Sequence, residues 1–159
     1  LSSRPGVDPL RIGAVGLSMG GEEAIGAAAR DPRIRAVVAE GATGRVAADH
    51  AWLSDEYGWR GAVQEGLEWL TTGCTAVLTP APRPMALRDA VAAAAPRPVL
   101  LIAAGAVPDE VAADRYIRSG APSDVQLWVA PDAGHTAALS AHPQDWEQRV
   151  TAFLDAALG

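Results

Sequence analysis

The first residue with a clear chemical potential is Ser18, which stands between glycines in residues 16–20 (GLSMG). A buried strand is predicted over residues 11–17, and an alanine-rich helix over residues 21–30. A serine at this kind of turn fits the G-x-S-x-G nucleophile elbow, which lifts its hydroxyl above the edge of a sheet. We expect the turn to require glycine on both sides of the serine. The backbone N–H of Met19 would then face a developing oxyanion. The alternative, a glycine-rich turn that contains a serine by chance, is disfavoured by this strand-to-helix context.

A serine hydroxyl needs a base that accepts its proton, and the base needs an acid that orients it. The chain has three histidines. His50 lies in an irregular region and His142 near the start of the last predicted helix, whereas His135 follows a predicted strand at residues 125–130. Because the carboxyl ends of parallel strands share one edge of a sheet, we expect His135 to lie near Ser18. The alternative roles for His135 are a solvated loop residue or a cap of the last helix.

Two neighbouring carboxylates, Asp109 and Glu110, follow a predicted strand at residues 99–104 and are the candidates for the acid. The shorter side chain favours Asp109, and Glu110 is the alternative. Asp109 also suits the first turn of the helix predicted over residues 109–119, where an acid is stabilised without any catalytic role. Glu40 ends another predicted strand and faces the same edge, either as a pocket residue or as the partner of a helix dipole.

The elements that must position these residues alternate between strands and helices. Strands are predicted over residues 11–17, 33–40, 99–104 and 125–130, and their nearly continuous apolar runs are typical of parallel strands that are covered on both faces. The predicted fold class is therefore α/β, with a mostly parallel sheet of about four strands and flanking helices.

The pattern breaks down over residues 42–84, which we call the lid segment. Three of the five tryptophans lie there, Trp52, Trp59 and Trp69, and they could line an apolar acyl pocket. The length of this connection favours an inserted helical lid over an ordinary irregular crossover.

Composition limits the function classes. The 159 residues suit one domain, and a net charge of −6 disfavours a nucleic-acid partner. The single cysteine, Cys74, excludes an internal disulfide and a multi-cysteine metal site, and we expect it to be a small buried residue. The sequence shows neither a signal peptide nor an apolar run of about 20 residues, so the default expectation is a cytoplasmic location.

The segments RIGAVGLSMGG, AVVAEGATGR, APRPVLLIAAG and PDAGHT, in the order serine, acid, histidine, resemble the second half of bacterial α/β-hydrolases. The similar groups are the dienelactone-hydrolase-like and acyl-peptidase-like enzymes. The resemblance implies a partial α/β-hydrolase domain over residues 1–159. Asp109 resembles the acid of the family's D-x-V motif, although it follows Gly105 by four positions where two or three are usual. Dienelactone hydrolases proper carry cysteine at the elbow, so Ser18 argues against that activity.

The resemblance implies a serine hydrolase that cleaves a small-molecule carboxylic ester or thioester through an acyl-enzyme, without a metal or organic cofactor. A peptidase or an acyltransferase of the same fold is an alternative. A further alternative is a catalytically silent relative that binds an acyl ligand or a partner protein. No HG-type motif, the family's source of a second oxyanion donor, precedes Ser18. We also expect one edge of the strand at residues 11–17 to be bare, so that a preceding segment of a longer chain or another copy covers it.

Overall fold

The computed structural model describes residues 4–80 and 82–159 of the chain. Its elements follow one another in the order β1 (Ile12–Leu17), α1 (Met19–Arg30), β2 (Ile34–Glu40), η1 (Ala47–His50), α2 (Leu53–Tyr57), α3 (Trp59–Leu78), α4 (Leu87–Ala94), β3 (Val99–Ala104), α5 (Pro108–Arg118), β4 (Val125–Ala130), α6 (Ala138–Ala141) and α7 (Pro143–Leu158).

Within the described residues, four parallel strands form a sheet in the order β1-β2-β3-β4. Valine, isoleucine and leucine dominate the two central strands, and the side chains of β3 are buried throughout. This confirms the predicted α/β class. The strand bounds agree with the sequence prediction to within one residue, because long apolar runs between polar turns are a local signal.

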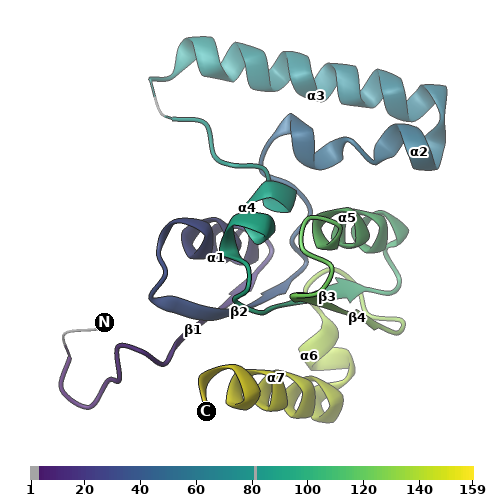
Figure 1. Cartoon of the computed structure of the whole chain (residues 1–159). Helices are drawn as coiled ribbons and strands as arrows, with labels where there is room; N and C mark the ends of the chain where they lie inside the picture. The colour runs from purple at the N-terminus through teal and green to yellow at the C-terminus, as the bar shows by residue number, and fades with distance from the viewer. Residues whose placement is uncertain (1–3, 81) are drawn as a thin grey trace.

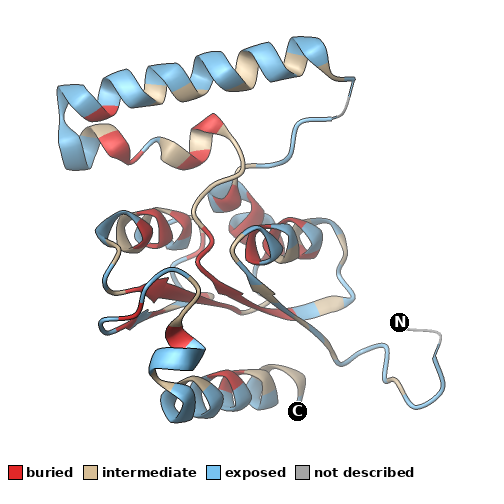
Figure 2. Cartoon of the chain, turned by 180° about the vertical axis from the view of Figure 1, so that it is seen from behind, coloured by how far each residue is buried: buried red, intermediate tan, exposed pale blue. Residues whose placement is uncertain are grey.

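Helices cover both faces of the sheet (Figure 1). On one face, α1, α4 and α5 enclose a core that includes Ile25, Leu87 and Ile117. On the other face, α7 packs on the sheet through Val150 and Phe153, and α6 contributes the buried Ala138. Figure 2 shows that the buried residues concentrate in the strands and on the helix faces that touch them. The sheet is thus held between two helical layers.

The lid segment contains η1, α2 and α3, and the two α-helices lie above the rest of the molecule (Figure 1). The longest helix of the lid segment, α3, runs from Trp59 to Leu78. Residues 59–79 contain no proline, so the helix can continue almost to Pro80. Within the described residues, no helix is both long and apolar enough to cross a membrane.

The strand β1 lies at one edge of the described sheet, and the side chains of Val15 and Leu17 are each 52% exposed. What covers this edge stays a prediction. The expectation that Cys74 is buried is wrong, because the cysteine lies on an exposed face of α3.

Candidate active site

The turn between β1 and α1 holds Ser18 in a backbone conformation that residues with side chains rarely adopt, with φ 51° and ψ −126°. A Cβ on Gly16 would lie 2.2 Å from the Gly20 carbonyl oxygen, so no side chain fits there. Gly20 itself faces open space, whereas a Cβ on Gly21 would lie 3.0 Å from that of Ala39. The expected glycine requirement after the serine therefore falls on Gly21 rather than on Gly20, because Gly21 packs against β2.

The hydroxyl of Ser18 and the ring of His135 meet above the carboxyl ends of the strands. The distance from Ser18 Oγ to His135 Nε2 is 3.0 Å, although the residues are 117 positions apart. The backbone N–H of Ser18 also donates to the Glu40 carbonyl oxygen at 2.7 Å, which ties the turn to the end of β2. The fold thus brings together the two residues that the sequence analysis paired.

The carboxylate beside His135 is that of Glu110. Its Oε2 lies 2.8 Å from His135 Nδ1, and its Oε1 accepts a 2.7 Å hydrogen bond from the backbone N–H of Ala104. The Glu110 side chain is only 1% exposed, so both of its oxygens are held in place. This orientation fixes the ring so that Nε2 faces Ser18.

The preference for Asp109 as the partner of His135 is therefore corrected. Asp109 lies in the first turn of α5 and accepts a hydrogen bond from the hydroxyl of Tyr57 on α2. The bond to Asp109 raises the pKa of the Tyr57 phenol above its ordinary value. The structure places Asp109 as a link between α5 and the lid segment.

Gly41 leaves room for the ring of His135, and Glu40 anchors the segment that follows this histidine. A Cβ on Gly41, which has φ +70°, would lie 2.8 Å from His135 Cε1, so only glycine leaves room for the ring. The buried carboxylate of Glu40 accepts hydrogen bonds from the Ala138 backbone N–H at 2.8 Å and from Trp146 Nε1 at 2.9 Å. Ala138 begins α6, so the helix-partner alternative for Glu40 is the one that the structure supports. The position of Glu40-Gly41 after a buried strand was the only sequence signal for these roles.

Met19 is the first residue of α1, so its backbone N–H has no partner inside the helix. The helix dipole also favours negative charge at this end. The Met19 N–H is therefore a backbone donor beside the serine that can face an oxyanion.

The loop after β2 is tied to the same end of α1, because Glu22 Oε1 accepts from the backbone N–H groups of Thr43 and Gly44 at 3.2 and 3.1 Å.

A cavity of about 290 Å³ opens beside His135 and Glu110, below the lid segment. Trp52 lines this cavity together with Leu53 and Val107, and its role in an acyl pocket stays a prediction. Trp59 and Trp69 do not line it, which corrects the prediction for those two residues. Their side chains on α3 are 74% and 56% exposed, because they lie on the side of the helix that faces solvent.

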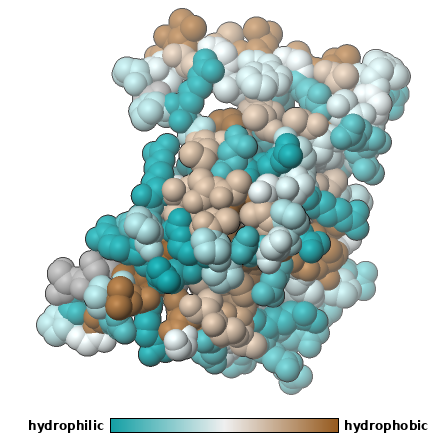
Figure 3. All heavy atoms as spheres, in the orientation of Figure 1, coloured by the Kyte–Doolittle hydropathy of each residue, from teal (hydrophilic) through white to brown (hydrophobic). Residues whose placement is uncertain are grey.

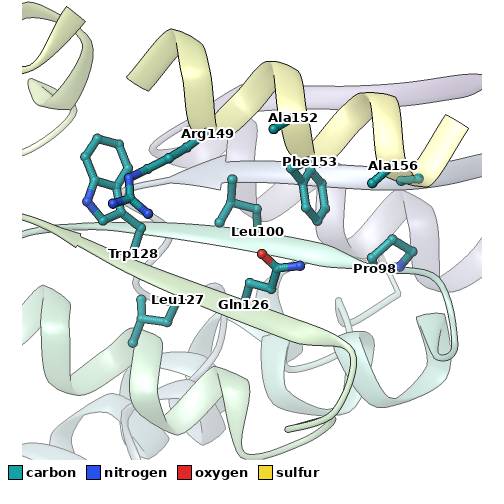
Figure 4. Close-up of a pocket in the computed structure, with 10 residues that line it drawn as sticks. Pro98, Leu100, Gln126, Leu127, Trp128, Arg149, Ala152, Phe153 and Ala156 are labelled. Carbon is teal, nitrogen blue, oxygen red and sulfur yellow. The ribbon is translucent and has the colours of Figure 1, made fainter. Parts of the chain in front are cut away.

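Further cavities lie away from the serine, and Trp69 lines a shallow one of about 420 Å³ on the outer side of α3. Two others adjoin the sheet and the lid segment. One, of about 480 Å³, lies under α3 and shares His50 with the cavity beside His135. The other, of about 520 Å³, lies between α7 and the strands β3 and β4 (Figure 4). There the guanidinium of Arg149 lies 5.0 Å from the centre of the Trp128 ring, and Phe153 packs over the strands. This cavity is on the opposite face of the sheet from α5 and contains no residue of the serine site.

Another buried acid, Asp114, lies one turn beyond Glu110 on α5. Its side chain is fully buried, and within the described part of the chain neither of its oxygens has a hydrogen-bond partner. Burial raises the pKa of the Asp114 carboxyl well above its ordinary value, and the nearby charge of Glu110 raises it further. The folded protein therefore favours the protonated form of Asp114.

The sheet order, the strained serine turn and the serine–histidine–carboxylate contacts define the second half of an α/β-hydrolase fold. Solved structures bear this out. The chain is similar to the esterase Pf2001 of Pyrococcus furiosus, with 22% identity and a TM-score of 0.60 over 94% of this chain and 55% of that one. It is also similar to the α/β-hydrolase GrgF of a Penicillium species, with 14% identity and a TM-score of 0.67 over 99% and 67% of the two chains.

The proline iminopeptidase of Mycobacterium smegmatis has the same fold, with 14% identity and a TM-score of 0.54 over 93% of this chain and 66% of that chain. The chain spans little more than half the length of the Pyrococcus esterase. No protein-family model matches the sequence, and no curated protein matches it either. At these identities the similarity establishes the fold.

Proposed function

We propose that this chain carries the catalytic residues of a serine hydrolase that cleaves a carboxylic ester or thioester. The observation that carries the proposal is the continuous contact from Ser18 through His135 to Glu110. An isolated serine at a turn has an unreactive hydroxyl, whereas a serine bonded to an oriented imidazole can lose its proton as it attacks. Hydrolases of this fold among the similar structures support the same reading.

In the proposed reaction, Ser18 Oγ attacks the substrate carbonyl carbon and its proton passes to His135 Nε2. Glu110 stabilises the imidazolium through Nδ1–H, and the Met19 N–H stabilises the oxyanion. The C–O or C–S bond then breaks, and His135 returns the proton to the leaving alcohol or thiol. A water molecule, deprotonated by His135, attacks the acyl-enzyme and releases the carboxylic acid and the free serine. The protons balance over the cycle, and no step requires a metal or an organic cofactor.

The dimensions of the site favour a small substrate. The cavity beside His135 measures about 290 Å³, close to the lower end of the range for ligand pockets. Trp52 and Leu53 give it apolar walls that suit a short acyl or alkyl group. The lid segment supplies both residues, so we expect its position to govern which substrates enter.

A fluorophosphonate probe tests the proposal, because it phosphonylates only an activated serine. We expect the chain to be labelled, and mass spectrometry of the peptides to place the adduct on Ser18. Labelling should vanish in Ser18→Ala and fall at least about 100-fold in His135→Ala. The matched control is His142→Ala, since this histidine contacts the Pro131 carbonyl oxygen and not the serine.

A folded sample that is not labelled would contradict the proposal and support a catalytically silent relative that binds an acyl ligand. If labelling succeeds, a panel of short and long acyl esters, thioesters and aminoacyl amides separates an esterase from a peptidase. We expect the short acyl esters and thioesters to be cleaved fastest. Adding alcohols or amines to the same assay distinguishes an acyltransferase by the transfer product.

A further inference from the structure

The long helix of the lid segment, α3, turns its apolar side away from the protein. Trp59, Val63, Leu67 and Leu70 are between 54% and 74% exposed, and Val77 is 86% exposed. The same apolar surface forms the upper margin of the molecule in Figure 3. A surface helix normally buries its apolar stripe and exposes its charges, so this arrangement is inverted.

The side of α3 that faces the protein is polar. Glu65 accepts a 2.7 Å hydrogen bond from the Ser54 backbone N–H, and Glu68 and Thr72 line the cavity under the helix. Gly61 packs against the backbone of Leu53, where no side chain would fit. The core of this chain therefore does not account for the apolar residues of α3, and they form a surface for a partner.

The spacing of the exposed residues indicates what kind of partner fits. Val63, Leu67, Leu70, Cys74 and Val77 follow one another at alternating intervals of four and three residues. This spacing matches two heptads of a coiled-coil seam, in which the side chains lie along one line of the helix. The residues that flank the seam carry no charge, and they are Gln64, Gly66, Thr71, Gly73 and Leu78. Gly66 and Gly73 face open space, so a second helix can approach closely.

We propose that α3 pairs with α3 of a second copy of this chain, in antiparallel orientation about a two-fold axis. In this register Leu67 faces the second copy's Leu70, and Val63 faces its Cys74. Each pair then occurs twice, as a closed two-fold interface requires. The 20 residues of α3 make a helix about 30 Å long, and the seam from Val63 to Val77 covers about 21 Å of it. The proposal does not depend on the hydrolase function.

The charge at the start of the helix selects the antiparallel orientation. Arg60 occupies the seam position that precedes Val63, three residues earlier in the chain. In a parallel pair it would face the second copy's Arg60, and the two helix dipoles would lie side by side with equal direction. In the antiparallel pair Arg60 lies near the carboxyl end of the opposite helix, where a positive charge is stabilised.

A lipid surface is a less suitable occupant. Helices that lie on membranes usually carry lysine and arginine on their polar side. The polar side of α3 carries Glu65 and Glu68 instead, and the whole chain has a net charge of −6. The observations therefore favour a second copy.

Cross-linking tests both the pairing and its orientation. We expect light scattering during size-exclusion chromatography to give twice the mass of one chain, and Leu67→Glu with Leu70→Glu to give the mass of one chain. Val63→Cys should form a disulfide with the second copy's Cys74 under mild oxidation. The wild-type chain should not cross-link, because the two Cys74 residues would be about 16 Å apart along the axis. Glu56→Cys, on exposed α2, is the matched control and should not cross-link in the dimer.

Three results would overturn the proposal. The first is a wild-type chain that stays monomeric at high micromolar concentration while circular dichroism shows it to be helical. The second is efficient cross-linking of wild-type Cys74 alone, which requires a parallel pair. The third is a monomer that binds neutral phosphatidylcholine vesicles and loses that binding in the Leu67→Glu, Leu70→Glu variant. That result would assign the surface to lipid.

Discussion

His135 Nδ1 lies 2.8 Å from Glu110 Oε2, on the side of the imidazole ring away from Ser18. The bond joins the loop after β4 to the first turn of α5, so it couples two neighbouring strand ends. Asp109, one residue earlier, bonds to Tyr57 instead. Two adjacent acids thus serve different parts of the molecule, one the imidazole and one the lid segment.

This division predicts different effects for two matched substitutions. Glu110→Gln should lower kcat/KM for a short acyl ester by about 10³–10⁴-fold, because the imidazole loses the charge that stabilises its protonated form. Asp109→Asn should change kcat/KM by less than about 10-fold, since Asp109 does not touch His135. Steady-state kinetics on both variants provide the measurement. Equal losses in the two variants would contradict the assignment of Glu110.

The serine turn predicts a contrast between its flanking glycines. Gly16→Ala would push a methyl group to within 2.2 Å of the Gly20 carbonyl oxygen, and we expect it to lower the free energy of unfolding by about 3 kcal/mol or more. Gly20→Ala meets no atom within 4 Å and lies in the first turn of α1. We expect Gly20→Ala to leave stability unchanged or raise it by up to about 1 kcal/mol. Chemical denaturation of both variants decides between these outcomes, and an unaffected Gly16→Ala would show that the turn is not close-packed.

The contact between Gly41 and His135 predicts a loss of serine reactivity in Gly41→Ala. The new Cβ would displace the imidazole, and a small displacement lowers the rate at which Ser18 reacts by about 10-fold or more. The rate of fluorophosphonate labelling is the measurement. Gly58→Ala is the control, because Gly58 also has a positive φ but no neighbour within 4 Å. The Gly58→Ala variant should be less stable because of backbone strain, and it should be labelled at the wild-type rate.

The burial of the Asp114 carboxyl predicts that Asp114→Asn stabilises the protein in a pH-dependent way. Its folded-state pKa is raised, so the folded protein holds a proton that the unfolded chain releases above its ordinary pKa of about 4. The free energy of unfolding of the wild type therefore falls as the pH rises above about 4. Until the pH reaches the folded-state pKa, the loss is up to about 1.4 kcal/mol for each pH unit. Asparagine carries no proton to lose. The melting temperatures of wild type and Asp114→Asn should agree near pH 3.5 and diverge toward pH 8.

Exposed Asp155 on α7 is the matched control for this pH series. Asp155→Asn should show no comparable divergence between low and high pH. If Asp114→Asn melts below the wild type at pH 8, the carboxylate has a favourable ionised role and the argument from its burial is wrong.

The sequence determined the strands, the serine turn and the loop histidine. Residues 99–104 and 125–130 are continuous apolar runs, and Ser18 lies between glycines that follow such a run. These signals are local, since burial of a parallel strand and a tight turn each leave their mark within a few residues. The meeting of Ser18 and His135 also followed from the sequence, because parallel strands end at a common edge.

Only the tertiary structure decided which acid faces His135 and which tryptophan faces the cavity. Asp109 and Glu110 are neighbours on α5, and their side chains point about 100° apart around its axis. The rotation of that helix is set by the burial of Ala113 and Ile117, and their spacing in the sequence fits either acid. For Trp59 and Trp69 the rotation of α3 is decisive, and its inverted apolar face gave no guide to which side meets the protein. Helix rotation depends on packing between distant segments, whereas the strands and the turn depend on neighbours in the chain.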